Sequence, residues 1–222
     1  MLQRVTELLI LFTLSFFAYT ASGAERMGQA RLFLGSAQIK PTELNTELSA
    51  QGLKNADLNN QFGVEITFPF SDNLNGGLRY AKHLISQDEA NGSSATDYHM
   101  TLDQDVAALV GRYAFFKTEI IRLDVVLGVG GSNTTYEIKT ATQNGSLTKT
   151  GSPFATLYSL GGISMAIGHG NYHFILESGY ESQKADGFEK TGTINNNVSS
   201  IDLSGPYLTI GFMFDGIPIS MK

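Results

Sequence analysis

The chain has 222 residues, a formal net charge of −6, four histidines, and neither cysteine nor tryptophan. This length suits one ordinary domain, and no Pro- or Ser-rich linker divides it. The mild acidity argues against a nucleic-acid partner, which usually needs a clustered basic surface, and the lack of cysteine excludes disulfides and thiolate sites.

The first 24 residues have the pattern of a secretory signal peptide. Arg4 supplies a positive charge, residues 8–18 form an apolar run, and Ser22-Gly23-Ala24 provides small residues before a cleavage site. A transmembrane anchor is the alternative, but the run is shorter than the ~20 residues that span a bilayer as a helix. We therefore expect an exported chain whose mature form begins at Glu25.

Eight later segments alternate side chains with the period of two of a β-strand. They cover residues 29–38, 61–70, 75–85, 98–116, 121–139, 153–167, 171–183 and 201–214. The fourth segment has apolar residues on both faces, which predicts a bulge near Ala107. The mean hydropathy of −0.04 does not exclude a membrane barrel, because lipid-facing and inward-facing residues average out.

The stretch between the first two segments changes period. Leu44 and Leu48 are four residues apart, Pro41 suits a first helical turn, and Gly52 suits a helix end. The pattern predicts a short helix in a long connection. With Leu53, its leucines would form an apolar cap over the barrel mouth or against lipid headgroups.

The last segment has one apolar face, which we expect to contact lipid. That face consists of Leu208, Ile210, Phe212 and Phe214. The opposite face should point into a lumen and consists of Tyr207, Thr209, Gly211 and Met213. An even number of strands lets the first and last strands pair antiparallel, so that no edge remains open.

The connections between the segments sort into two classes. Those after the second, fourth and sixth segments are about three residues long, and include Ser71-Asp72-Asn73, Lys117-Thr118 and Gly168-His169-Gly170. The polar stretches after the first, third, fifth and seventh segments are long, and are predicted as loops over residues 40–60, 86–97, 140–152 and 184–200. Outer-membrane barrels sort their connections in this way, with short periplasmic turns and longer external loops.

Aromatic residues lie beside the short turns and at the end of the last segment. They predict an aromatic ring at the periplasmic interface, made of Phe68, Phe70, Tyr113, Phe115, Tyr172, Phe174, Phe212 and Phe214. A second ring at the other interface would contain Tyr98, Tyr136, Phe154 and Tyr180.

In these features the chain resembles the small eight-stranded outer-membrane β-barrels of the OmpA/OmpX type, and the ending Phe212-Met213-Phe214 is similar to their insertion signal. The resemblance implies an all-β fold, an eight-stranded antiparallel up-and-down transmembrane barrel over residues 25–214. It also implies insertion by the barrel-assembly machinery, contact with outer-membrane lipid, a monomeric state and both termini in the periplasm. The chain departs from the family by continuing through a short tail, residues 215–222.

The alternation directs charged side chains into the lumen, because charges facing lipid are costly. These are Arg31, Glu65, Arg79, Arg122, Asp124 and Glu177, and Arg112 is a further candidate if the fourth segment bulges. An eight-stranded barrel is only wide enough for side chains to fill, so mixed charges should pair and plug it. A narrow aqueous path lined by the same charges is the alternative.

No pattern specifies a metal, cofactor or catalytic site. His83 with His99, and His169 with His173, offer too few converging ligands for a metal. His99, Ser86 or Glu89 could serve a lipid-modifying enzyme, but no motif places a nucleophile beside a base. The glycine runs lack the spacing and the following helix of a phosphate loop.

We therefore expect an integral protein of the bacterial outer membrane, not an enzyme, with a structural or surface-interaction role. One alternative is a small pore for minor solutes. Others are an outer-membrane lipid-modifying hydrolase or acyltransferase, and a soluble periplasmic ligand-binding barrel.

Overall fold

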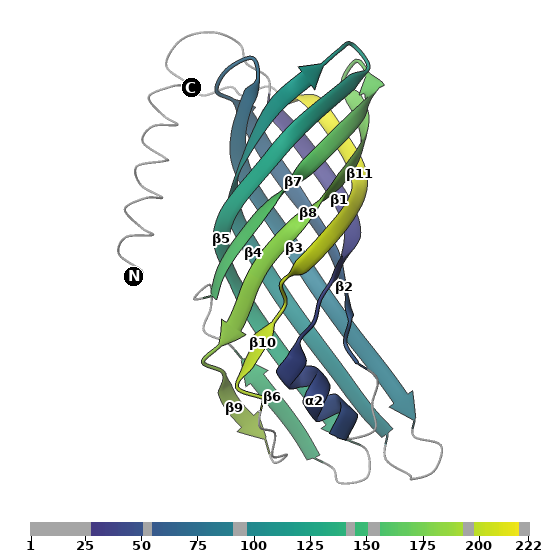
Figure 1. Ribbon diagram of the computed structural model, residues 1–222, viewed down its shortest axis with the longest axis vertical. Helices are drawn as coiled ribbons and strands as arrows, with labels where there is room; N and C mark the ends of the chain where they lie inside the picture. Colours follow the sequence, from purple (N-terminus) through teal and green to yellow (C-terminus); the bar gives the residue numbers. More distant parts are fainter. Residues whose placement is uncertain are drawn as a thin grey trace.

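The computed structural model describes residues 28–50, 55–90, 97–140, 145–150, 156–192 and 198–217, which form one sheet and one helix (Figure 1). The strands are β1 (Gly28–Gln38), β2 (Leu58–Pro69), β3 (Leu74–Ala90), β4 (Asp97–Lys117), β5 (Ile121–Thr140), β6 (Gly145–Thr150), β7 (Thr156–His169), β8 (Tyr172–Asp186), β9 (Glu189–Gly192), β10 (Ser200–Asp202) and β11 (Gly205–Ile217). The helix is α2 (Thr42–Ala50), and no helix in these residues is long and apolar enough to span a membrane. The predicted signal peptide lies outside the described residues.

Eight long strands form a closed ring in which every neighbouring pair is antiparallel. The ring runs β1, β2, β3, β4, β5, β7, β8 and β11, and β11 then pairs with β1. In that closing pair, Ala30 lies opposite Phe214 and Ala37 opposite Tyr207. Because every ring strand has two partners, none presents a free edge along the wall. The predicted eight-stranded antiparallel barrel is confirmed.

The three short turns join strands at one end of the barrel, drawn at the top of Figure 1. The hydroxyl of Ser71 accepts the Leu74 N–H at 3.1 Å, and that of Thr118 accepts the Ile121 N–H at 2.9 Å. Gly170 has φ 65°, a left-handed conformation that glycine adopts readily. Side-chain hydrogen bonds in two turns, and the backbone freedom of glycine in the third, therefore favour all three turns where the sequence predicts them.

The predicted bulge near Ala107 is wrong. The pairing of β4 with β3 is continuous across Ala107, and inward and outward side chains alternate without a break through this stretch. The irregularity occurs later, between Ala114 and Phe116 in the pairing with β5. β4 has apolar residues on both faces because Val106, Ala108 and Val110 belong to an apolar cluster inside the barrel, while Tyr113 and Phe115 are exposed on the outer wall.

The predicted last strand is interrupted and ends later than predicted. Between β10 and β11, the Ser204 N–H donates to Asp202 Oδ1 at 2.9 Å and forms a local turn. A side chain at Gly205 would collide with the carbonyl oxygen of Gln38, so the chain re-enters the sheet at a glycine. β11 then continues to Ile217, because Asp215 still pairs with Gln29 of β1.

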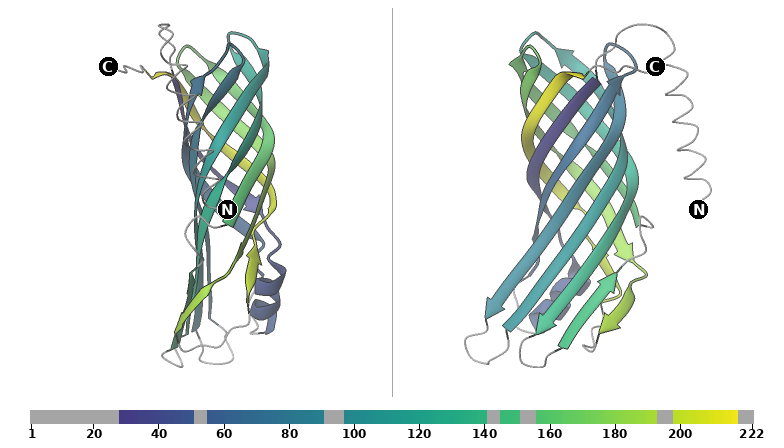
Figure 2. Two further views of the ribbon diagram at one scale, coloured as in Figure 1. Left: turned by 90° about the vertical axis from the view of Figure 1, so that its left-hand side faces the viewer. Right: turned by 180° about the vertical axis from the view of Figure 1, so that it is seen from behind.

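The opposite end of the barrel contains more strand than the sequence predicts. β3 runs to Ala90 and β5 to Thr140, while β6 and β9 form in stretches predicted as loops (Figure 2). β6 has the sequence Gly-Ser-Leu-Thr-Lys-Thr, whose polar side chains give no apolar alternation to detect. β6 pairs with β5, and β9 pairs with β6, so hydrogen bonds to neighbouring strands define both.

The predicted helix is confirmed as α2, which lies at this same end (Figure 1). Leu44 and Leu48 are fully buried in an apolar cluster that also contains Met100, Leu102 and Tyr136. The first part of the connection therefore folds back over the barrel mouth. Leu53 lies outside the described residues.

Candidate functional site in the barrel lumen

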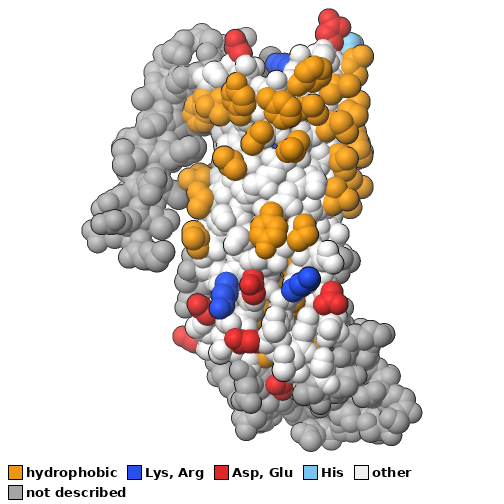
Figure 3. All heavy atoms as spheres, viewed as in Figure 1, with side chains coloured by type: hydrophobic (Ala, Val, Ile, Leu, Met, Phe, Trp, Pro, Cys, Tyr) orange, Lys and Arg blue, Asp and Glu red, His pale blue; other side chains and the backbone are white. Residues whose placement is uncertain are grey.

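The outer wall of the barrel is apolar over a band of limited height (Figure 3). In β7 the exposed apolar positions run from Leu157 to Ile167, and in β8 from Tyr172 to Tyr180. These spans of eleven and nine residues match the roughly 9–11 residues with which a tilted strand crosses a bilayer.

Within the described ring strands, outward-facing charges border the apolar band toward the long-connection end, and at the other end exposed charges lie at or beside the short turns, at Asp72, Lys117 and Glu119. Among the described residues of the ring strands, the first outward-facing charges in this direction are Lys82 in β3, Asp105 in β4 and Lys184 in β8. Lys82 Nζ lies 2.7 Å from Asp103 Oδ1 and 3.6 Å from Asp105 Oδ1. The apolar band thus has a defined polar border on this side.

All eight members of the predicted periplasmic ring lie near the short turns. Tyr113, Phe115, Tyr172, Phe174 and Phe212 are exposed, and Phe68, Phe70 and Phe214 are partly buried. Two pairs make edge-to-face contacts across β8 and β11: Tyr172 with Phe214 at 5.6 Å, and Phe174 with Phe212 at 6.1 Å between ring centroids.

The second predicted ring is wrong at Tyr136. This side chain is fully buried in the apolar cluster at the mouth, because it shares the inward face of β5 with Asp124 and Val126. Tyr180 does face outward and is 55% exposed. Phe154 and the Tyr98 side chain lie outside the described part of the chain.

The structure places all seven predicted lumen charges inside the barrel, each no more than 8% exposed. At the centre, Arg112 Nε donates to Glu65 Oε1 at 2.5 Å, and one Arg112 amino group donates to Glu65 Oε2 at 2.8 Å and Glu177 Oε2 at 2.6 Å. One guanidinium thus joins two carboxylates from β2 and β8. Such two-pronged, charge-assisted hydrogen bonds are among the strongest in proteins.

The remaining four charges extend this pairing on both sides. Arg79 donates to Glu177 Oε1 at 2.7 Å, and Arg31 donates to Asp124 Oδ2 at 3.1 Å. Arg122 Nε donates to Asp124 Oδ1 at 2.6 Å, while Arg31 also lies 3.8 Å from Glu65. We call these seven residues the ion-pair network, since every member is linked to the others through these contacts.

Three neutral side chains support the network without having been predicted to do so. The Tyr207 hydroxyl donates to Glu177 Oε1 at 3.0 Å, and Ser164 Oγ accepts from Arg31 at 3.1 Å. The Arg79 guanidinium lies 4.1 Å from the centre of the Phe33 ring, a cation–π geometry. Strand parity places Tyr207 and Phe33 inside, but gives no indication of which charge each one meets.

A second group of buried polar side chains was not predicted at all. Glu181 Oε1 lies 3.6 Å from His83 Nδ1, and the Tyr158 hydroxyl donates to Glu181 Oε2 at 3.3 Å. Glu181 follows Glu177 by four residues, so the period of two was the available signal for its inward position. His83 is fully buried in the lumen, and the side chain of its predicted neighbour His99 is not among those described.

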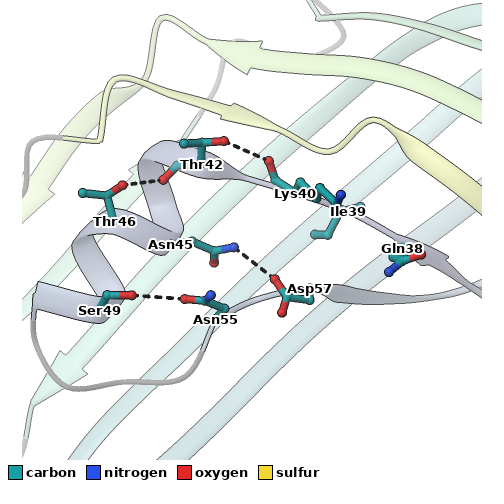
Figure 4. A pocket seen from close by; sticks show the side chains of 9 residues that line it. All are labelled: Gln38, Ile39, Lys40, Thr42, Asn45, Thr46, Ser49, Asn55 and Asp57. Carbon is teal, nitrogen blue, oxygen red and sulfur yellow. Dashed lines mark hydrogen bonds between the residues drawn. The ribbon is translucent and has the colours of Figure 1, made fainter.

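The apolar cap over the mouth is fastened at two places. On one side, Asn45 Nδ2 donates to Asp57 Oδ1 at 3.2 Å, and the Ala56 N–H donates to Asn45 Oδ1 at 2.8 Å, beside an open pocket of about 600 Å³ (Figure 4). On the other side, Glu43 accepts hydrogen bonds of 2.9–3.1 Å from the backbone and hydroxyl groups of Ser199 and Ser200. These four hydrogen bonds lower the pKa of the Glu43 carboxyl to about 2, and the bond from the Ser200 N–H has the largest effect.

The remaining histidines form no cluster. His169 is exposed at its turn, and His173 Nδ1 lies 3.5 Å from Asp215 Oδ2. Within the described residues, no three His, Cys, Asp or Glu side chains gather as a metal site. The Ser86, Glu89 and His99 side chains, considered for an enzyme, fall outside the described side chains.

Comparison with solved structures identifies the architecture. The outer-membrane protease OmpT of Escherichia coli aligns over 87% of this chain and 99% of its own, with 11% identity and a TM-score of 0.50. The fold is that of the outer-membrane β-barrels. The attachment invasion locus protein Ail of Yersinia pestis (84% and 99% covered, 16% identity, TM-score 0.46) and CarO2 of Acinetobacter baumannii (87% and 100% covered, 11% identity, TM-score 0.45) also align. Neither a protein-family model nor a curated protein matches the sequence.

Proposed function

We propose that the protein is an integral, non-enzymatic barrel of the bacterial outer membrane, with a closed lumen and a structural or surface-interaction role. The observation that carries this proposal is the contrast between the two faces of the wall. Outward positions are exposed and apolar over a height that fits a bilayer, while seven charges are buried and paired inside. A lipid environment explains both features, because it favours apolar side chains on the outer face and requires charged side chains to be paired inside.

The soluble periplasmic alternative fits the outer wall poorly. Leu78, Leu127 and Ile163 are each more than half exposed, and they come from three different strands of the ring. Contiguous apolar surface of this extent is rare on soluble monomers and marks a surface that is covered in the working protein. In the proposed setting outer-membrane lipid covers it, and the barrel remains a monomer.

The ion-pair network supports a closed lumen rather than an open pore. Its side chains come from six strands and meet across the interior at hydrogen-bonding distances, which leaves the interior filled at that level. Buried ions are tolerated when they are paired in this way. The network thus acts as a structural plug, and the small pore stays an alternative that conductance can decide.

The proposed orientation follows from the two ends. The short turns would lie in the periplasm, and α2, β6, β9 and β10 would lie outside the cell. The Phe212-Met213-Phe214 sequence in the closing strand supports recognition by the barrel-assembly machinery during insertion, after export through a cleaved signal peptide. Any surface interaction would use the external end, where backbone and polar side chains extend beyond the apolar band.

The proposal is tested by refolding the mature chain from urea into detergent micelles. A folded membrane barrel should need detergent to stay in solution and should migrate faster on a gel before boiling than after it. Protein that dissolves without detergent and shows no heat-dependent shift would contradict the membrane assignment. The same preparation in a planar bilayer should show no steady conductance steps, and steady steps in the unaltered protein would favour the pore.

A further inference from the structure

Six buried polar side chains form a layer between the ion-pair network and the mouth. They are Asn59, Gln61, His83, Gln104, Glu181 and Gln183, each no more than 3% exposed, and we call them the polar layer. In β3 the inward positions run from Arg79 through His83 to Ile85, which belongs to the apolar cluster at the mouth. The same order of network, polar layer and cap is repeated along β4, and along β2 together with Ala56, which precedes that strand.

Contacts connect the polar layer across the lumen. Asn59 Nδ2 lies 2.9 Å from His83 Nδ1, and Glu181 approaches the same nitrogen from β8 on another part of the wall. Gln61 and Gln104 are the two cross-strand neighbours of His83 in the sheet register. These contacts and register positions group Asn59, Gln61, Gln104 and Glu181 around His83. Gln183 is the next inward-facing residue after Glu181 in β8.

Many polar atoms of this layer have no hydrogen-bond partner among the described residues. They are Asn59 Oδ1, Gln61 Nε2, His83 Nε2, Gln104 Oε1, Glu181 Oε1 and both amide atoms of Gln183. Buried polar atoms without partners are costly, and native proteins usually satisfy such groups with internal water. Seven such atoms in one layer point to a bound species that makes several hydrogen bonds.

The chemistry of these atoms favours a neutral species that both donates and accepts. The amide nitrogens of the layer donate hydrogen bonds, and its amide and carboxylate oxygens accept them. A species bound there must therefore both accept and donate. With Glu181 ionised and His83 neutral, the four arginines and four carboxylates of the network and the polar layer balance. The charge balance therefore calls for no additional ion, and water meets the requirement.

We propose that the polar layer binds a cluster of water molecules, and that the lumen is a hydrated chamber closed by two independent seals. The inference rests on the proposed membrane function. The ion-pair network is the inner seal. The outer seal is the lid, which we define as α2 with its buried Leu44 and Leu48 packed against Met100 and Leu102.

The two seals are structurally separate. The lid is held by Glu43 to Ser199 and Ser200, and by Asn45 to Asp57, and none of these bonds involves the ion-pair network. Removing one seal should leave the other in place. When one seal is removed, water in the chamber becomes continuous with only one side of the membrane, so ions still cannot cross.

Crystallography tests the chamber directly. A structure of the detergent-purified protein at a resolution that shows ordered water should have solvent density at hydrogen-bonding distance from Gln61 Nε2, His83 Nε2 and the Gln183 amide. A Gln183→Leu variant should lose the density beside residue 183 and keep the rest. An unaltered protein in which these side chains hydrogen-bond only to one another, with no solvent between them, would overturn the proposal.

Conductance tests the two seals. The lid variant Leu44→Ser/Leu48→Ser and the network variant Arg79→Ala/Glu177→Ala, which removes one charge of each sign, should each remain silent in a planar bilayer. Their combination should show steady steps. Steps from either variant alone, or silence from the combination, would contradict two independent seals.

Each variant is first checked for the heat-dependent gel shift. Loss of the shift in the unaltered protein would refute the membrane function itself rather than the two seals. If the combined variant fails to fold, the crystallographic test of the unaltered protein still decides whether the chamber is hydrated.

Discussion

The ion-pair network and the lid occupy opposite ends of one lumen and are built from opposite interactions. The network joins charges from six strands, and its bonded pairs are as far apart in sequence as Arg79 and Glu177, 98 residues. The lid buries aliphatic side chains of one short helix and is held by hydrogen bonds at exposed residues. The network is therefore part of the barrel's own stability, whereas the lid can loosen without opening the barrel.

The largest effect is expected from breaking the network at its centre. A Glu65→Ala change removes one of the two carboxylates that the buried Arg112 guanidinium contacts. Arg31 and Arg79 also lose a nearby carboxylate, and keep only Asp124 and Glu177, respectively. Removing one partner of a buried ion pair typically costs about 3–5 kcal/mol. Urea unfolding in micelles should show this loss.

The matched control is Asp72→Ala, which removes an exposed carboxylate at a short turn. Its urea midpoint should stay close to that of the unaltered protein. Equal midpoints for the two variants would show that the network does not stabilise the barrel.

A smaller and more local effect is expected from the lid. Leu48→Ala removes fully buried aliphatic atoms, and such changes typically cost about 2–5 kcal/mol. Here the cost should fall on lid opening, so limited proteolysis near α2 should become faster while the heat-dependent gel shift stays unchanged. If Leu48→Ala lowered the stability of the barrel as much as Glu65→Ala does, the lid would unfold together with the barrel and would not open separately.

A third prediction concerns the outer wall. Phe174 and Phe212 meet edge to face, and such pairs contribute about 0.5–1.5 kcal/mol beyond their buried area. A double-mutant cycle with Phe174→Leu and Phe212→Leu should give a coupling energy in this range. A cycle combining Phe174→Leu with the distant Leu78→Ala is the control and should give none.

The smallest effect is expected at Glu43, which is fully exposed. Its pKa lies near 2 in the folded protein and near 4.5 without its serine partners, so the ionised form is favoured by folding. The stabilisation is therefore complete above about pH 4.5 and is lost as the pH falls toward 2. Proteolysis of the lid by an acid-active protease should quicken over that window, and Glu43→Gln should remove this pH dependence.

The sequence alone determined which way most barrel side chains point. In β2 and β11 the period of two assigned Val64, Glu65, Tyr207 and Phe212 to the correct faces, because the direction of a strand side chain depends only on its position along that strand. Short turns were equally predictable, since residues such as Ser71 bond their own backbone. In β6, where nearly all side chains are polar, there is no alternation of apolar and polar residues, and the strand was not predicted.

Only the tertiary structure decided which inward residues meet. Glu65 pairs with Arg112, 47 residues away, and Glu181 approaches His83 from another part of the wall. These encounters depend on the stagger and tilt of strands in the closed sheet, which no single strand encodes. Sequence therefore determined the inside and outside of this barrel, while ring closure created the ion-pair network, the polar layer and the seat of the lid.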